Sequence, residues 1–263
     1  MKIAFIGAGR LASNLAPALQ AAGNEVVEVW SRSRASAEAL AARLGCRGCW
    51  GTLDKATREA DLYLICVRDA VLAEAIGALH AGREQALFAH TAGSMPLSLF
   101  ADAGHARGGV FYPLQTFSKE RQVDFKRVHF FLEASCAEDR LLLRELAASV
   151  ASPEHIHAAT SADRRHLHLA AVFACNFANH CFALADEVMH DADLPFEAML
   201  PLIEETVQKL HELSPREAQT GPAIRHDANV VGMQRSMMLQ RPDLLQVYNT
   251  LTKSIQQLET RND

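Results

Sequence analysis

The feature that most constrains the fold is a glycine-rich segment that directly follows an apolar run. Residues 2–6 read KIAFI, and Gly7-Ala8-Gly9-Arg10-Leu11-Ala12 follows before a helical pattern over residues 10–22. In such a unit the first glycine makes the tight turn, the second lets the backbone approach a pyrophosphate, and the alanine permits close helix packing. The helix N-terminus offers free N–H groups to phosphates. We therefore expect Gly7, Ala8, Gly9, Arg10 and Leu11 to contact a dinucleotide.

Short apolar runs alternate with helical patterns through the first 158 residues. The expected strands are residues 2–6, 25–30, 62–67, 87–90, 109–112 and 128–132, with a short apolar piece at 46–50. Helices are expected over residues 10–22, 35–44, 53–59 and 70–80. This alternation is typical of a parallel sheet with crossover helices. It predicts an α/β fold, a Rossmann-type doubly wound and mostly parallel sheet, for a dinucleotide-binding domain over residues 1–158.

The pattern changes after residue 158, where no alternating strand pattern returns. Helices are expected over residues 161–189, 196–213, 227–239 and 242–258. Residues 159–263 therefore form a smaller, all-helical domain, assigned to substrate binding and dimerisation. The first of these helices is unusually long for a globular domain, and small apolar residues recur on it at helical spacing. It is either a core helix or also the face of a homodimer.

Composition excludes several classes of partner. Apolar residues make up 49% of the chain and charged residues 22%, as in ordinary soluble proteins. The formal charge of −5 argues against nucleic acid, which basic surfaces bind. Unbroken apolar runs fall short of a membrane span, and no signal peptide precedes the first strand. We expect a cytoplasmic protein with a small-molecule substrate and no membrane or nucleic-acid partner.

Cysteine and histidine give no convincing metal pattern. Six cysteines are too few for a disulfide scaffold in a chain of 263 residues, so free thiols are expected. Cys46 and Cys49 form a single CxxC without a second one. The HxH pairs His155/His157 and His166/His168 lack an evident further ligand. We expect no metal.

The choice of dinucleotide depends on the end of the second strand. An NAD enzyme usually places a carboxylate there on the ribose hydroxyls. This chain has Ser31-Arg32-Ser33-Arg34 instead. Guanidinium and hydroxyl groups suit a 2′-phosphate, although these arginines are alternatively solvated residues that lead into a helix. The segment favours NADP over NAD, with Ser31, Arg32 and Ser33 against the cofactor.

Further loops follow the later strands, where ligands of open sheets bind. Cys66, Val67 and Arg68 follow the fourth strand, and Ala92 and Gly93 follow the fifth; all five are expected to contact the cofactor. Ser94 and Gln115 are expected to bind substrate.

A hydride transfer also needs a group that exchanges a proton with the substrate. The candidates are His168, Asn176 and Tyr112, with Lys119 as a further donor. His168 is the first choice because histidine titrates near neutral pH; it is alternatively a boundary histidine. Asn179 and Arg225 are candidates for substrate binding. Arg225 could pair with a carboxylate, or it could simply lie at a solvated helix start.

Several segments, in order along nearly the whole chain, carry a family resemblance: GAGRLA, SRS, CVRD, HTAGS, YPLQTFS, HLAAVFACNFANH, LPLIEET and SPREAQTGPAIRHD. The chain resembles a family of NADP-linked oxidoreductases that joins a Rossmann-like domain to a C-terminal helical domain of unknown function. That family is distantly similar to pyrroline-5-carboxylate reductase, prephenate dehydrogenase, deazaflavin-dependent NADP oxidoreductases and the 6-phosphogluconate dehydrogenase group. The resemblance implies the fold, the cofactor class and a reaction site in the cleft between the domains, but no substrate.

Departures from these relatives limit what can be transferred. The lysine–asparagine pair of the β-hydroxyacid dehydrogenases is absent, because Val172 and Cys175 precede Asn176 and Asn179 by one turn. Two hypotheses remain. The first is an NADP-dependent oxidoreductase acting on a small, anionic metabolite with a C=O, C=N or secondary alcohol group. The second is a non-catalytic protein that binds or senses NADP(H).

Overall fold

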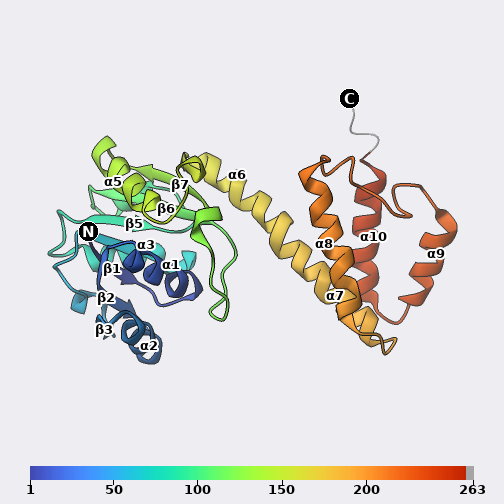
Figure 1. The fold of residues 1–263 in the computed structure, drawn as a ribbon, viewed down its shortest axis with the longest axis horizontal. Coiled ribbons are helices and arrows are strands. Elements are labelled where there is room, and N and C mark those ends of the chain that lie inside the picture. Colours follow the sequence, from blue (N-terminus) through green and yellow to red (C-terminus); the bar gives the residue numbers. More distant parts are fainter. Residues whose placement is uncertain (259–263) are drawn as a thin grey trace. The chain divides into compact units, whose positions relative to one another are not determined.

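A computed structural model describes residues 1–258. Its N-terminal part is built on an eight-stranded sheet with the order β3-β2-β1-β4-β5-β6-β7-β8 (Figure 1). The strands are β1 (Lys2–Ile6), β2 (Glu25–Ser31), β3 (Arg47–Trp50), β4 (Leu62–Ile65), β5 (Leu87–His90), β6 (Gly108–Leu114), β7 (His129–Ala134) and β8 (Ile156–Ala158). All neighbouring strands are parallel except β6 and β7. The predicted Rossmann-type sheet is thus confirmed.

Helices cover both faces of the sheet because successive side chains of each strand point to opposite sides. Ile3 and Phe5 of β1 pack in a core with α1 (Arg10–Ala21), α2 (Arg34–Leu44) and α5 (Ala137–Ala148). Ala4 and Ile6 pack in a second core with α3 (Leu72–His80) and α4 (Ser98–Asp102). Strands apolar on both faces are typical of parallel sheets covered by helices.

Most of the expected strands and helices are present, with shifts of a few residues at their ends. The helix expected over residues 53–59 is only a 3₁₀ turn at Leu53–Lys55. Helices α4 and α5 were not among the expected elements. The segment with the His155/His157 pair includes β8, which pairs with β7.

One long helical segment runs from Ser161 to His190. It comprises α6 (Ser161–Ala171), a π-helical stretch (Val172–Phe177) and α7 (Ala178–His190). The segment is long and apolar enough to cross a membrane by length and composition, and none of its most apolar window is buried within the chain. A single helix of this kind is weak evidence for a span.

The chain divides into two compact units, Met1–Asn176 and the residues from Phe177 onward. The expected boundary at residue 158 marks the end of the strand pattern. Along the chain, the first compact unit ends and the second begins within the π-helical stretch. The second unit contains α7, α8 (Leu200–Gln208), α9 (Ala228–Met237) and α10 (Pro242–Gln256).

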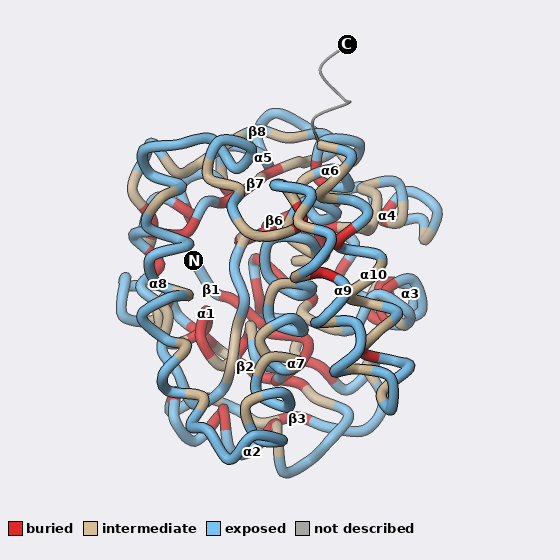
Figure 2. Tube along the Cα trace, turned by 90° about the vertical axis from the view of Figure 1, so that its right-hand side faces the viewer, coloured by how far each residue is buried: buried red, intermediate tan, exposed pale blue. Residues whose placement is uncertain are grey.

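Burial differs between the two units. Figure 2 shows buried residues concentrated on the strands, whereas α7, α8, α9 and α10 are mostly exposed or intermediate. Within the second unit Arg241 joins the start of α10 to the end of α7, through ion pairs with Glu187 and, at 3.1 Å, with Asp191. Exposed apolar side chains nevertheless remain on this unit, including Leu202 at 61% and Val207 at 55%.

Candidate functional site

The turn after β1 brings three strand ends together. Gly7 has a φ of +116°, which L side chains rarely adopt, and its N–H donates to the Trp30 carbonyl at 2.7 Å. A Cβ at Gly7 would lie 2.5 Å from the Cys66 carbonyl oxygen. The carboxyl ends of β1, β2 and β4 therefore meet here. This is the point where the strand order reverses and where open α/β sheets bind ligands.

The N-terminus of α1 is open. Gly9 is its N-cap and supplies no side-chain cap, and the first turn contains no acidic residue. A Cβ at Gly9 would meet nothing within 4 Å. Free N–H groups, positive helix dipole and space together fit a pyrophosphate. Ala8 is buried and Leu11 half-buried, so they can contribute backbone atoms, whereas Arg10 is exposed.

A lysine that sequence reasoning considered only as a proton donor lies beside this turn. The loop after β6 is fastened to α1 by Asn14, whose amide donates to the Ser118 carbonyl at 2.8 Å and accepts from the Val123 N–H at 3.2 Å. Lys119 thereby lines a cavity of about 130 Å³ together with Ala8 of the glycine turn. Its ammonium group is placed to attract phosphate. No local motif indicates this role, because it depends on a loop a hundred residues away.

Ser31, the last residue of β2, and Ser33, just beyond it, have structural partners. Ser33 caps α2, because its hydroxyl accepts the Ser36 N–H at 3.4 Å, and the Ser31 hydroxyl accepts the Ser33 N–H at 3.3 Å. Arg32 is exposed. The segment therefore presents the solvated guanidinium of Arg32 and a capped helix start to the region of the adenine ribose.

The loop after β4 contributes the unreactive side chain of Cys66 and the charge of Arg68. Burial raises the pKa of the Cys66 thiol to about 12, so Cys66 is an inert wall and no nucleophile. Val67 is half-buried and Arg68 exposed. Asp69, which sequence reasoning did not select, accepts a short hydrogen bond from the Ser94 hydroxyl. This bond joins the loops after β4 and β5.

The loop after β5 packs tightly on β6. A Cβ at Gly93 would lie 2.7 Å from Cζ of Tyr112, so only glycine lets the aromatic ring lie against this backbone. Ala92 is half-buried beside it, and its N–H donates to His90 Nδ1 at 3.2 Å. Gly93 therefore determines where the Tyr112 ring lies, and Ala92 holds the loop to the end of β5.

Two predicted catalytic residues come together. The hydroxyl of Tyr112, on β6, lies 3.5 Å from Nδ1 of His168, on α6. Tyr112 is 8% exposed and its burial raises the pKa of the phenol, although the nearby Arg164 charge lowers it. The phenol thus stays protonated at neutral pH and can donate. His168 is exposed, so a substrate can reach it.

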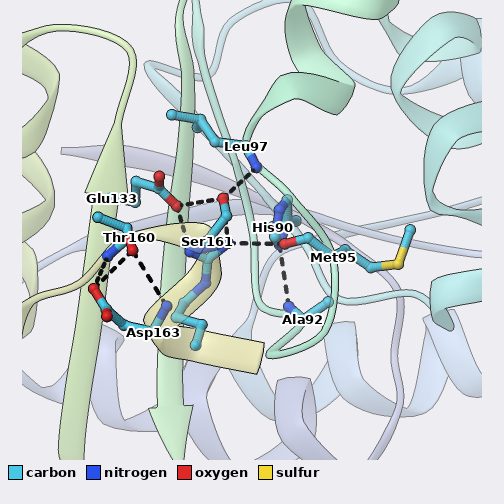
Figure 3. Close-up of polar contacts among 9 residues, drawn as sticks. His90, Ala92, Met95, Leu97, Glu133, Thr160, Ser161 and Asp163 are labelled. Atoms are coloured by element: carbon cyan, nitrogen blue, oxygen red, sulfur yellow. Dashed lines mark hydrogen bonds and ion pairs between the residues drawn. The ribbon is translucent and has the colours of Figure 1, made fainter. Parts of the chain in front are cut away.

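A buried arginine anchors the helix that carries His168. Arg164 is fully buried; its guanidinium pairs with Glu133 of β7 and donates to the Met95 carbonyl at 2.8 Å. The Ser161 hydroxyl donates to Glu133 at 2.8 Å and accepts the Leu97 N–H at 3.0 Å. Figure 3 shows Ser161 between Glu133, Leu97 and Met95. Sequence reasoning missed this network, because an arginine in a helix is usually solvated.

A capping box fixes the first turn of the same helix. Thr160 accepts the Asp163 N–H at 3.2 Å, and Asp163 accepts the Thr160 N–H at 2.9 Å (Figure 3). The S/T-x-x-D spacing satisfies two otherwise free backbone donors. Helix α6 therefore starts at a defined residue, one turn before Arg164 and two turns before His168.

Buried His90 predicts a loss of stability in acid. Burial, with a contribution from the Arg164 charge, lowers the pKa of His90 to about 4. The His90 ring stacks on Phe100, with 5.6 Å between the ring centres. In the unfolded chain the His90 imidazole is protonated as the pH falls below about 6.5, whereas in the folded chain it is protonated only near pH 4. Stability is therefore lost as the pH falls through this window. The variant His90→Gln keeps a hydrogen-bond acceptor for the Ala92 N–H. Between pH 7 and 4.5, its free energy of unfolding should fall by about 2 kcal/mol less than that of the wild type.

Denaturant titrations of both proteins at the two pH values measure this difference. His105 and His129, whose pKa values are also lowered, are present in both proteins and cancel in the comparison. An identical pH dependence for the wild type and His90→Gln would contradict the assignment.

The remaining predicted residues belong to both compact units. Gln115 is exposed and its Oε1 accepts the N–H of the next residue at 2.9 Å. Asn176 is exposed in the π-helical stretch, a feature that often occurs at functional sites. Asn179 and Arg225 are exposed in the second unit, where Asp227 caps α9. Among residues 1–258 no group of three His, Cys, Asp or Glu side chains is arranged to hold a metal.

Comparisons with known proteins identify the family of the chain. Residues 2–92 match the model of coenzyme F420-dependent NADP oxidoreductases, and residues 128–255 match a domain of unknown function. A search of curated proteins gives no match.

Solved structures are similar over nearly the whole chain. A Bacteroides fragilis protein assigned as an NADP oxidoreductase is 45% identical, with 97% of each chain covered and a TM-score of 0.91. An imine reductase from Myxococcus stipitatus in complex with NADP⁺ is 16% identical over 100% of this chain and 95% of its own, with a TM-score of 0.67. A pyrroline-5-carboxylate reductase from Coxiella burnetii is 17% identical over 96% and 97%, with a TM-score of 0.56.

Proposed function

Because this chain belongs to the family of NADP oxidoreductases that joins a dinucleotide-binding domain to a helical C-terminal domain, we propose that it transfers a hydride between NADP(H) and a small, anionic metabolite. The reacting group is a C=O, a C=N or the corresponding secondary alcohol or amine. The observation that carries this proposal is the meeting of Tyr112 and His168 at 3.5 Å, from elements more than fifty residues apart. In enzymes without bound substrate, catalytic hydrogen bonds are often long, and they shorten when substrate binds.

The two side chains act in sequence in one proton transfer during reduction. NADPH, when bound, supplies the hydride that forms the new C–H bond. The Tyr112 hydroxyl, kept protonated by burial, donates its proton to the oxygen or nitrogen that gains charge. His168 then returns a proton to the phenolate through Nδ1 and exchanges it with solvent, because it is exposed. In oxidation the same steps run in reverse.

The cofactor is held by backbone and charge. Gly7 and Gly9 leave the turn open, the N-terminus of α1 donates N–H groups, and Lys119 adds a cation beside Ala8. Arg32 faces solvent after β2. Arg68 stays a candidate for the cofactor, and the exposed guanidinium group of Arg225 suits a substrate carboxylate. Ser94, Gln115, Asn176 and Asn179 are further candidates for substrate binding.

A metabolite panel tests the activity. The protein is mixed with NADPH and, one at a time, with small keto acids, cyclic and acyclic imines and carboxylated aldehydes, and absorbance at 340 nm is followed. We expect at least one anionic compound to be reduced faster than its neutral ester or amide. Tight NADPH binding without turnover of any compound, or the same rate with the uncharged analogues, would contradict the proposal.

We also propose that the protein is a cytoplasmic homodimer that associates through its helical domain. The support is the apolar surface left exposed on this domain, including Leu194, Leu202, Val207 and Leu210, and on the helix Ser161–His190. Exposed apolar area of this kind is typical of an interface between subunits. Sedimentation equilibrium without detergent should give twice the 28.8 kDa of the chain, and Leu202→Glu should shift the population to monomer. A wild-type monomer, or protein extracted only with detergent, would contradict it.

A further inference from the structure

Arg34, the first residue of α2, is held from two sides. Its Cζ lies 4.6 Å from the centre of the Trp50 ring, so the guanidinium stacks over the indole. Its Nε donates to Glu38 Oε1 at 2.7 Å, one turn further along the helix. The arginine side chain still retains 66% of its exposure, so much of the guanidinium remains open to solvent.

This three-residue group lies at the expected position of the adenine ribose. Ser31, the last residue of β2, pairs in register with Trp50, the last residue of β3. The preceding residue of β2, Trp30, accepts the hydrogen bond from Gly7 of the phosphate-binding turn. The ribose nearest the adenine binds beyond the end of the second strand of such a sheet, and a 2′-phosphate is read there. The group is therefore close to the atoms that distinguish NADP from NAD.

Arg32 and Arg34 differ in how they are held. Within residues 1–258 the side chain of Arg32 makes no hydrogen bond, ion pair or ring contact, whereas Arg34 is oriented by both Trp50 and Glu38. A flexible cation attracts any phosphate, but a planar guanidinium held in one orientation can bind a phosphate bidentately. Discrimination at the 2′-position therefore depends on Arg34 more than on Arg32.

We propose that Trp50 and Glu38 tune the preference for NADP(H) over NAD(H) in opposite directions by acting on Arg34: Trp50 strengthens the preference and Glu38 weakens it. Trp50 supports one face of the guanidinium, so that the opposite face and the terminal N–H groups can meet the adenine and the 2′-phosphate. Glu38 neutralises Arg34 while the site is free and competes with the phosphate for it. Both are positioning residues, because they act through Arg34. The inference rests on NADP as the cofactor and is independent of the Tyr112–His168 chemistry.

Binding measurements test this division of roles. Calorimetry should give the Kd of NADPH and of NADH for the wild type, Trp50→Ala, Trp50→Phe and Glu38→Gln. Trp50→Ala should weaken NADPH binding by about 3- to 10-fold and NADH binding by less than about 2-fold, and Trp50→Phe should restore part of the loss. Glu38→Gln should tighten NADPH binding by about 2- to 5-fold, because the phosphate loses a competitor.

A matched variant controls for overall charge. Arg140→Met removes an exposed guanidinium from α5, on a different helix, and should leave the NADPH/NADH ratio unchanged. Thermal unfolding of every variant checks that the domain is folded. Equal weakening of NADPH and NADH in Trp50→Ala would assign Trp50 to general binding and overturn the proposal. No response in either Trp50→Ala or Glu38→Gln would also overturn it.

Fluorescence gives a second readout. The protein has two tryptophans, of which Trp30 is buried and Trp50 is 38% exposed. The probe 2′,5′-ADP carries the phosphate but no nicotinamide, so it does not absorb at the emission wavelength. It should change the wild-type emission but not that of Trp50→Phe, and 5′-ADP should have a smaller effect. An unchanged wild-type spectrum at saturating 2′,5′-ADP contradicts the proposal, whatever the enzyme does in turnover.

Discussion

Tyr112→Phe and His168→Gln should each lower kcat/KM by about 10²- to 10⁴-fold, with the Kd of NADPH nearly unchanged. Tyr112→Phe removes the hydroxyl that lies 3.5 Å from His168 Nδ1 and keeps the ring that packs on Gly93. His168→Gln removes the group that restores the proton. Because both act in one proton transfer, the double variant should be hardly slower than either single variant. Stopped-flow absorbance at 340 nm, with the substrate found in the panel, measures the step directly.

His166→Gln is the matched control for this experiment. His166 lies on the same helix and is also exposed, but its Nδ1 is bonded to the Ala162 carbonyl at 2.9 Å. Its rate should stay within about 2-fold of the wild type. Fully additive losses in the double variant would show that Tyr112 and His168 act separately. Full activity of Tyr112→Phe would remove the phenol from the mechanism.

Arg164→Met should lower the free energy of unfolding by about 3 kcal/mol. Its guanidinium is fully buried and faces Glu133, which is only 20% exposed, so the carboxylate would lose its partner in a poorly solvated place. The Met95 carbonyl and Ser161 would lose donors as well. Urea titration at pH 7 measures the change.

The same variant should reduce activity beyond its effect on stability. Arg164 and His168 are one turn apart on α6, so the ion pair with Glu133 sets the position of the helix face that carries His168. Removal of the Arg164 charge should also raise the pKa of Tyr112 further, which the phenol's ultraviolet titration reports. Arg165→Met, which removes the adjacent exposed guanidinium, is the control and should change the unfolding free energy by less than about 0.5 kcal/mol. A similar loss in both variants would mean that burial of Arg164 is unimportant.

The Rossmann-type sheet could be predicted because its signals are local. KIAFI followed by the glycine turn defines a strand and a helix start within twelve residues, and the structure has β1 and α1 there. The shorter helix at residues 53–55 and the unassigned α5 were harder to predict, because such segments are held by tertiary packing more than by their own periodicity. The π-helical stretch at Val172–Phe177 has no sequence signature at all.

The site was only partly predictable, for a related reason. Residue chemistry was enough to select Tyr112, His168 and the basic segment after β2. It did not reveal that Asp69 bonds to Ser94, that Lys119 lies beside Ala8, or that Arg164 is buried. Each of these depends on contacts between segments far apart in the chain. Arg34, which the sequence presents as equivalent to Arg32, differs from it only through Trp50 and Glu38.

The sequence by itself determined the fold class, the dinucleotide turn and the cofactor class, because glycine spacing and strand–helix alternation act over short distances. The tertiary structure decided which candidate residues meet. Tyr112 and His168 are brought to 3.5 Å by packing on Gly93 and by the anchoring of α6 through Arg164. The distance between Tyr112 and His168 arises from the packing of β6, β7 and α6. A buried ion pair or a close backbone approach produces no periodic pattern in a sequence, so neither could be predicted from it.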